Sequence, residues 1–174
     1  AFDRPGYSLV AWNTEPDGSG EQIGLGSRIT NPDSGKLTLY AQWAAWSSES
    51  DFRMENGKIL AYTGSEESVV IPESIGGETV RAIAEGAFTD CTAQEIIFPK
   101  TLETVEAGAF RNCALRELTF YDSIRFLPSD AFRDCENFST LHINAQRPPY
   151  GSHYRRESLL ADKLDLLILN QGKQ

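Results

Sequence analysis

The phrase Ala-Phe-x-Asx-Cys occurs three times in this chain at a fixed spacing of 22 residues. It lies within EGAFTDC at Glu85–Cys91, AGAFRNC at Ala107–Cys113 and SDAFRDC at Ser129–Cys135. The apolar residue five positions before each phenylalanine keeps the same period. A repeat of 20 to 29 residues is typical of leucine-rich arrays, in which each unit buries its apolar edge only against its neighbours.

Short β-prone runs fall between the three copies. VVIP, IIFP, LTFY and LHIN begin at residues 69, 96, 118 and 141, in steps of 27, 22 and 23 residues. The five extra residues of the first step are IGGET at 75–79, a glycine-rich turn insertion. One strand per repeat therefore predicts a parallel stack of coils.

Alternation within each run predicts which side chains face the core. In EIIFP, Ile96 and Phe98 point inward, while Glu95 and Ile97 lie on the exposed face of the sheet. Ala109-Phe110 is expected in a short helical turn, where the small alanine permits close stacking and the phenylalanine contributes burial worth about 2–3 kcal/mol.

Residues 51–145 resemble the BspA-type leucine-rich repeat, because YTGSEESVVIPESIGGETVRAIAEGAFTDC carries its IP…V…I…GAF…C frame. INAQRPP and LDLLILN resemble the closing coil of such arrays. The resemblance implies an α/β repeat: a right-handed leucine-rich-repeat solenoid with one short strand and one short helical turn per coil. We expect this domain to span 51–174, with an Asn56-Gly57 hairpin as its first cap, a helix at 158–163 and a last strand at 165–169.

The first 43 residues lack the period and alternate apolar and polar residues around Gly, Asp, Asn and Pro, which favours short antiparallel strands. YSLVAWN and LTLYAQW are the clearest of them. With its GY…W strand, DGSG turn and terminal LYAQW, residues 4–43 resemble the Listeria–Bacteroides (internalin B-type) repeat. A strand normally precedes the GY in that family, so we expect an incomplete β-grasp-like module at 1–43. Residues 44–50 are then a linker, in which Trp46 packs against the first coil.

Three in-phase cysteines raise three interpretations. A column of buried thiols is favoured, because a cysteine behaves as a small hydrophobe in a core and zinc sites use paired or mixed Cys/His ligands converging on one point. A disulfide between neighbouring coils and a metal or reactive thiol site are the alternatives.

Composition restricts the function. The net charge of −9 disfavours binding to nucleic acid or to anionic membranes, and no run is long enough to insert in a membrane as a helix. The two histidines, His142 and His153, lie in no nucleophile motif, so no catalytic residue, cofactor or metal site is predicted. PDGSGE and NPDSG lack the alternating ligands of calcium loops and are interpreted as turns.

The exposed face of the stacked strands is the candidate ligand site. Its residues are an apolar column edged by acids: Val70, Glu95, Ile97, Glu117, Thr119, Thr140 and His142. Repeat arrays use such continuous surfaces for recognition. The two resemblances imply a non-catalytic module of a secreted or cell-surface bacterial protein that binds an extracellular protein or glycan, with export signal and anchor outside this chain. The alternatives are a structural spacer without a ligand and the targeting module of a larger secreted enzyme.

Overall fold

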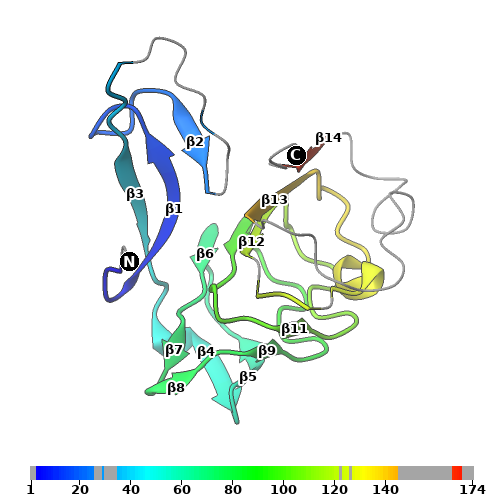
Figure 1. Ribbon diagram of the computed structural model, residues 1–174. Helices are drawn as coiled ribbons and strands as arrows, with labels where there is room; N and C mark the ends of the chain where they lie inside the picture. Colours follow the sequence, from blue (N-terminus) through cyan, green and yellow to red (C-terminus); the bar gives the residue numbers. More distant parts are fainter. Residues whose placement is uncertain are drawn as a thin grey trace.

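The computed structural model describes residues 3–25, 29, 35–121, 123–125, 127–144 and 166–169. Its N-terminal part is a three-stranded antiparallel sheet in the order β2-β1-β3, formed by β1 (Tyr7–Asn13), β2 (Gln22–Gly24) and β3 (Tyr40–Ala45) (Figure 1). Both strands expected from the sequence are therefore confirmed, and the completeness of the module stays a prediction.

The turn after β1 is organised by the buried side chain of Asn13. Its amide donates to the carbonyls of Gly18 and Gly20 at 3.0 and 3.2 Å, and its oxygen accepts from the Glu15 and Gly20 amides. The side chain of Asp17 accepts hydrogen bonds from Ser19, which lower the pKa of that carboxyl. PDGSGE is thus a turn, as predicted, whereas NPDSG lies largely outside the described residues.

The repeats form a five-stranded parallel sheet in the order β14-β13-β12-β10-β6. Its strands are β6 (Ser68–Val70), β10 (Glu95–Ile97), β12 (Glu117–Tyr121), β13 (Thr140–Asn144) and β14 (Leu166–Leu169). The registers place residues one repeat apart directly opposite each other, so the period read from the sequence is the stacking period. The predicted last strand is confirmed as β14, and the helix expected at 158–163 lies outside the described residues.

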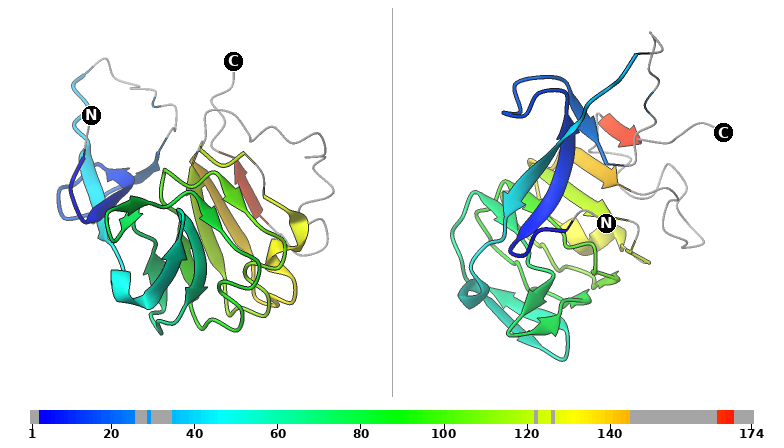
Figure 2. Two further views of the ribbon diagram at one scale, coloured as in Figure 1. Left: turned by 90° about the horizontal axis from the view of Figure 1, so that it is seen from below. Right: turned by 60° about the vertical axis from the view of Figure 1, so that its left-hand side comes forward.

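A second sheet, in the order β11-β9-β5-β4, lines another side of the repeats (Figures 1 and 2). β4 (Phe52–Glu55) and β5 (Lys58–Tyr62) form the predicted hairpin, and β9 (Ala82–Ile83) and β11 (Thr104–Val105) follow one repeat apart. Asn56 and Gly57 have φ of 51° and 73°, as a two-residue hairpin turn of this kind requires. The IGGET insertion forms its own hairpin from β7 (Ser74–Ile75) and β8 (Glu78–Thr79).

The core between the sheets is a row of stacked phenylalanines. Ring centroids of Phe88, Phe110 and Phe132 follow one another at 4.9 and 5.4 Å, and Phe138 continues the row at 4.9 Å from Phe132. The alanine before each repeated phenylalanine is buried, which lets successive coils come this close. The inward orientation of Ile96 and Phe98 is also confirmed, since neither is exposed.

The expected helical turn in every coil is wrong for two of the three copies. Residues 85–90 and 107–112 form hydrogen-bonded turns, and only the third copy contains a short 3₁₀ helix, η2 (Ser129–Phe132). With one other 3₁₀ turn, η1 (Glu49–Asp51), the described structure is mostly strand, so the α/β class is corrected to a β-rich leucine-rich-repeat fold. The reason is backbone geometry: Gly86 and Gly108 have positive φ values of 71° and 65° inside the first two turns, whereas the third copy has Asp130 at this position, without a positive φ.

The segment that joins the N-terminal sheet to the repeats, residues 44–50, is hydrogen-bonded to both of them. The indole N–H of Trp46 donates to Ser8 Oγ at 3.0 Å, within the N-terminal part. The packing of Trp46 against the first coil stays a prediction. The next residue makes the contact with the first coil: Ser47 N donates to the Val70 carbonyl at 2.9 Å, and Val70 N donates to Ser47 Oγ at 3.1 Å. Ser47 Oγ also bonds Glu66. The predicted linker is therefore tied to the edge strand β6.

Candidate functional site

The predicted face residues do lie in register across the parallel sheet. Glu95 pairs with Ser68 on one side and with Glu117 on the other, and Glu117 pairs with Thr140. Two residues along the strands, Val70, Ile97, Thr119 and His142 form the next row. The side chain of His142 lies outside the described part of the chain.

The predicted exposure of the apolar column is wrong. Val70, Ile97 and Thr119 are only 6%, 6% and 8% exposed. Two segments from the N-terminal side of the chain reach this face. Ser47 bonds to Val70, and Tyr121, which alternation places on the same face as Thr119, donates from its hydroxyl to the carbonyl of Leu9 in β1 at 2.9 Å. The right-hand view of Figure 2 shows β1 running across the strands of the repeat sheet.

The first residues of the same strands remain accessible. Glu117 is exposed, Glu95 and Thr140 are half-buried, and Ser68 Oγ donates to Glu95 Oε2 at 2.7 Å. These four residues, Ser68, Glu95, Glu117 and Thr140, form a polar row that we call the acidic row. Three of its members, Glu95, Glu117 and Thr140, belong to the predicted site and are at least partly exposed.

The environment of Tyr121 shows how closely the two parts meet. Burial raises the pKa of its phenol to about 12, and the Glu73 carboxylate adds to the shift. A neutral phenol is the form that can donate to Leu9, so the contact is maintained across the neutral pH range.

The three cysteines form the buried column that the sequence favours. Cys113 Sγ donates to the carbonyl of Phe88 at 2.7 Å, and Cys135 Sγ donates to the carbonyl of Phe110 at 2.9 Å, each one coil back. Hydrogen bonds with the Cys135 and Cys91 thiols and burial raise the pKa of Cys113. These two thiols thus each add a second donor to a turn carbonyl of the preceding coil, which also accepts from a backbone amide. Within the described ranges, no three His, Cys, Asp or Glu side chains converge on a point where a metal ion could bind.

Two surface glutamates, Glu103 and Glu106, bond to residues of other coils. Glu103 binds Arg81 at 2.7 Å and Arg125 at 3.3 Å, and these three residues are 22 positions apart. Glu106 accepts from Lys58 Nζ at 2.6 Å and from the Glu85 amide at 2.9 Å, and these bonds lower the pKa of its carboxyl. Both glutamates therefore join neighbouring coils.

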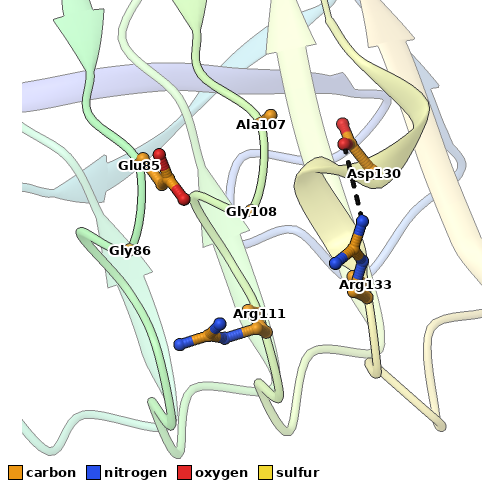
Figure 3. Close-up of a pocket in the computed structure, with 7 residues that line it drawn as sticks. All are labelled: Glu85, Gly86, Ala107, Gly108, Arg111, Asp130 and Arg133. Atoms are coloured by element: carbon orange, nitrogen blue, oxygen red, sulfur yellow. Dashed lines mark ion pairs between the residues drawn. The ribbon is translucent and has the colours of Figure 1, made fainter.

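A pocket of about 90 Å³ that sequence reasoning missed lies over the turns of the repeated phrase (Figure 3). It is lined by the residues Glu85, Gly86, Ala107, Gly108, Arg111, Asp130 and Arg133. The signal for it was present in the sequence: Gly86 and Gly108, and likewise Arg111 and Arg133, are one period apart. The repeat period places such pairs side by side on neighbouring coils.

The model of the BspA type leucine rich repeat region matches residues 58–154 in 6 copies, more than half of the chain. The chain belongs to the BspA-type leucine-rich repeat family. This BspA-type chain also resembles the solved T. pallidum leucine rich repeat protein, TpLRR, with a TM-score of 0.51 and 22% identity over 58% of this chain and 54% of that one. At this identity the likeness shows the fold alone.

A curated relative of the BspA-type chain is 52% identical over 42 residues, 24% of this chain and 6% of the other. It is a protein of Evansella cellulosilytica described as "Putative membrane protein". The chain thus spans about half the length of TpLRR and a small fraction of the Evansella protein. In the part of the chain that the structure describes, no helix is long and apolar enough to cross a membrane.

Proposed function

We propose that this chain is a non-catalytic recognition module of a larger bacterial cell-surface or secreted protein, and that it binds an extracellular protein or glycan. BspA-type repeats are commonly found in surface and protein-interaction modules, and family membership supports that role. In this proposal the coils wind as a right-handed solenoid and present their sheet to the ligand.

The observation that carries the proposal is the register of the acidic row. Residues from four neighbouring strands stand opposite one another, at the spacing of about 4.8 Å that parallel strands impose. A row of carboxylates and hydroxyls at this interval complements a ligand with repeated donors, such as a basic peptide strand or a chain of sugar hydroxyls. The buried column of Val70, Ile97 and Thr119 is left out of the proposed contact surface.

Binding is tested on an array of glycans and extracellular matrix proteins, comparing wild type with a Glu95→Ala/Glu117→Ala double variant. The expected result is a ligand that wild type retains and the double variant loses. Glu55→Ala on β4 is the matched control, because Glu55 is also exposed but lies on the other sheet. Equal binding by wild type and double variant would remove the acidic row from the site.

A second candidate function, a rigid spacer without its own ligand, is favoured by the junction. Ser47 bonds to Val70 and Tyr121 bonds to Leu9, so the N-terminal part is fixed to the array rather than tethered to it. A spacer predicts no retained ligand on the array and a single particle shape in small-angle scattering. A retained ligand that depends on the acidic row would reject this candidate.

A further inference from the structure

We propose that the pocket over the repeated turns is a binding site for a small zwitterion, an amino acid with its ammonium and carboxylate groups. The pocket lies on the turns rather than on the acidic row, so this inference does not rest on the recognition role proposed above. Its position is set by the repeated phrase itself, since three successive copies supply the lining.

The floor of the pocket is made by two glycines whose backbone groups are already paired. Gly86 N donates to the Gly108 carbonyl at 3.3 Å, and Gly108 N donates to the Asp130 carbonyl at 3.1 Å. These positive-φ positions, at 71° and 65°, carry no side chain, which leaves the hollow open. Because the floor donors are satisfied within the protein, recognition falls to the charged side chains at the rim.

The rim carries charges of both signs at separated places. Figure 3 shows Glu85 at one end and Arg111 at the other, with the two glycines between them. No ion pair with a described residue is found for either group, whereas Asp130 and Arg133 face each other at 3.9 Å. Two carboxylates and two guanidiniums give the pocket no net charge, so a bare anion or cation meets repulsion as well as attraction. A dipolar ligand matches both ends.

Size sets the class of ligand. The pocket holds about 90 Å³, several times the roughly 10–15 Å³ that a cavity needs to hold one water molecule. This space suits the backbone portion of an amino acid, whose carboxylate would form a bidentate pair with Arg111 and whose ammonium would bond Glu85. Because these groups are near solvent, affinity is expected to be in the range of roughly millimolar Kd.

The test is a titration of the ¹⁵N-labelled chain with glycine, followed by the amide resonances of Gly86 and Gly108. Acetate and methylammonium, each carrying one of the two charges, are titrated in parallel. We expect saturable shifts with glycine and at least about threefold weaker binding of either single ion. Equal binding of acetate would show a plain anion site, and the absence of saturable shifts with glycine would show no site; either result overturns the proposal.

Variants complete the test. Glu85→Gln and Arg111→Gln are each expected to raise the Kd for glycine about two- to fivefold. Arg53→Gln and Glu55→Gln on β4 are the matched controls, since both residues are exposed and remote from the pocket. Unchanged glycine affinity in both pocket variants, with an intact amide spectrum, would reject the assignment of the rim residues.

Discussion

The hydroxyl of Tyr121 donates a hydrogen bond of 2.9 Å to the carbonyl of Leu9, a residue 112 positions earlier in the chain. This bond joins the middle of the repeat sheet to the first strand of the N-terminal part. Together with the bonds between Ser47 and Val70 it makes the two parts one packed unit across a face that would otherwise be open. Removing this hydrogen bond should therefore weaken the packing between the two parts of the chain and leave the core of the repeats intact.

Tyr121→Phe is expected to lower the free energy of unfolding by about 1 kcal/mol, because it leaves a carbonyl of β1 without its donor and keeps the ring in place. The measurement is urea denaturation, supported by proteolysis of the segment between the parts, which should become faster. Tyr40→Phe serves as control, since Tyr40 is 38% exposed. Identical losses in both variants would contradict a specific role for the Tyr121 bond.

The same residue makes a prediction for alkaline solution. Burial raises the pKa of Tyr121 from 10.0 to about 12 in the folded chain, so its contribution to stability is complete below pH 10. That contribution is lost as the pH rises through about 12. The difference in unfolding free energy between wild type and Tyr121→Phe should shrink over this interval. A difference that stays constant up to pH 12 would show that the phenol is not the titrating group.

Much of the fold can be predicted from the sequence because the structure of each coil depends on residues that lie within one repeat or one period apart. The parallel strands, the Phe88–Phe110–Phe132 row and the Asn56-Gly57 turn each depend on residues whose spacing or identity dictates their neighbours. Once the 22-residue period is recognised, the position of one strand fixes the next. The register of the acidic row is a consequence of the same rule.

The failures have a different physical origin. The exposure of Ile97 was misjudged because alternation tells which face a side chain is on, and the element that covers that face comes from a distant part of the chain. Helical turns are absent from the first two copies because Gly86 and Gly108 adopt positive φ inside the turns, a conformation that glycine permits but that the repeat spacing does not reveal. The period places Arg111 beside Arg133, but it does not reveal that the turns leave a hollow between neighbouring coils.

Phe110 is the central ring of the core, and its loss should be severe. It is fully buried and its ring lies 4.9 Å from Phe88, 5.6 Å from Phe98 and 5.4 Å from Phe132. Phe110→Ala is expected to reduce stability by about 3–5 kcal/mol, because neighbouring coils cannot close the cavity without breaking register. Thermal and urea denaturation measure this loss of stability. Tyr40→Ala is the control, because Tyr40 is exposed, and it should change stability by less than about 0.5 kcal/mol. A comparable loss in both variants would be inconsistent with the stacked core.

The bonds of Glu106 predict that its contribution to the free energy of unfolding depends on pH in acidic solution. Its bonds to Lys58 and to the Glu85 amide hold the pKa of its carboxyl below its ordinary value of 4.5. A lowered pKa contributes stability above the unfolded value, which is lost as the pH falls through the folded one. Glu106→Gln is expected to lose about 0.5 kcal/mol near pH 7, a modest amount because the pair is partly exposed. The difference should shrink as the pH falls below 4.5. Glu55→Gln is the control; a deficit in Glu106→Gln that persists at low pH would point to packing instead of charge.

The buried column of thiols predicts that its cysteines react slowly with alkylating reagents. Cys113 is buried, its sulfur donates to Phe88, and its pKa is raised by hydrogen bonds with the Cys135 and Cys91 thiols and by burial. Since the thiolate is the reactive form, iodoacetamide should label Cys113 only when the coils open, at a rate that rises with denaturant. Ser65→Cys, which places a thiol at an exposed position near the first coil, is the control and should label rapidly without denaturant. Mass spectrometry after digestion identifies the labelled cysteines. Rapid labelling of Cys113 in the folded chain would restore the hypothesis of a reactive thiol. In that case Cys113→Ser would be expected to alter ligand binding as well as stability.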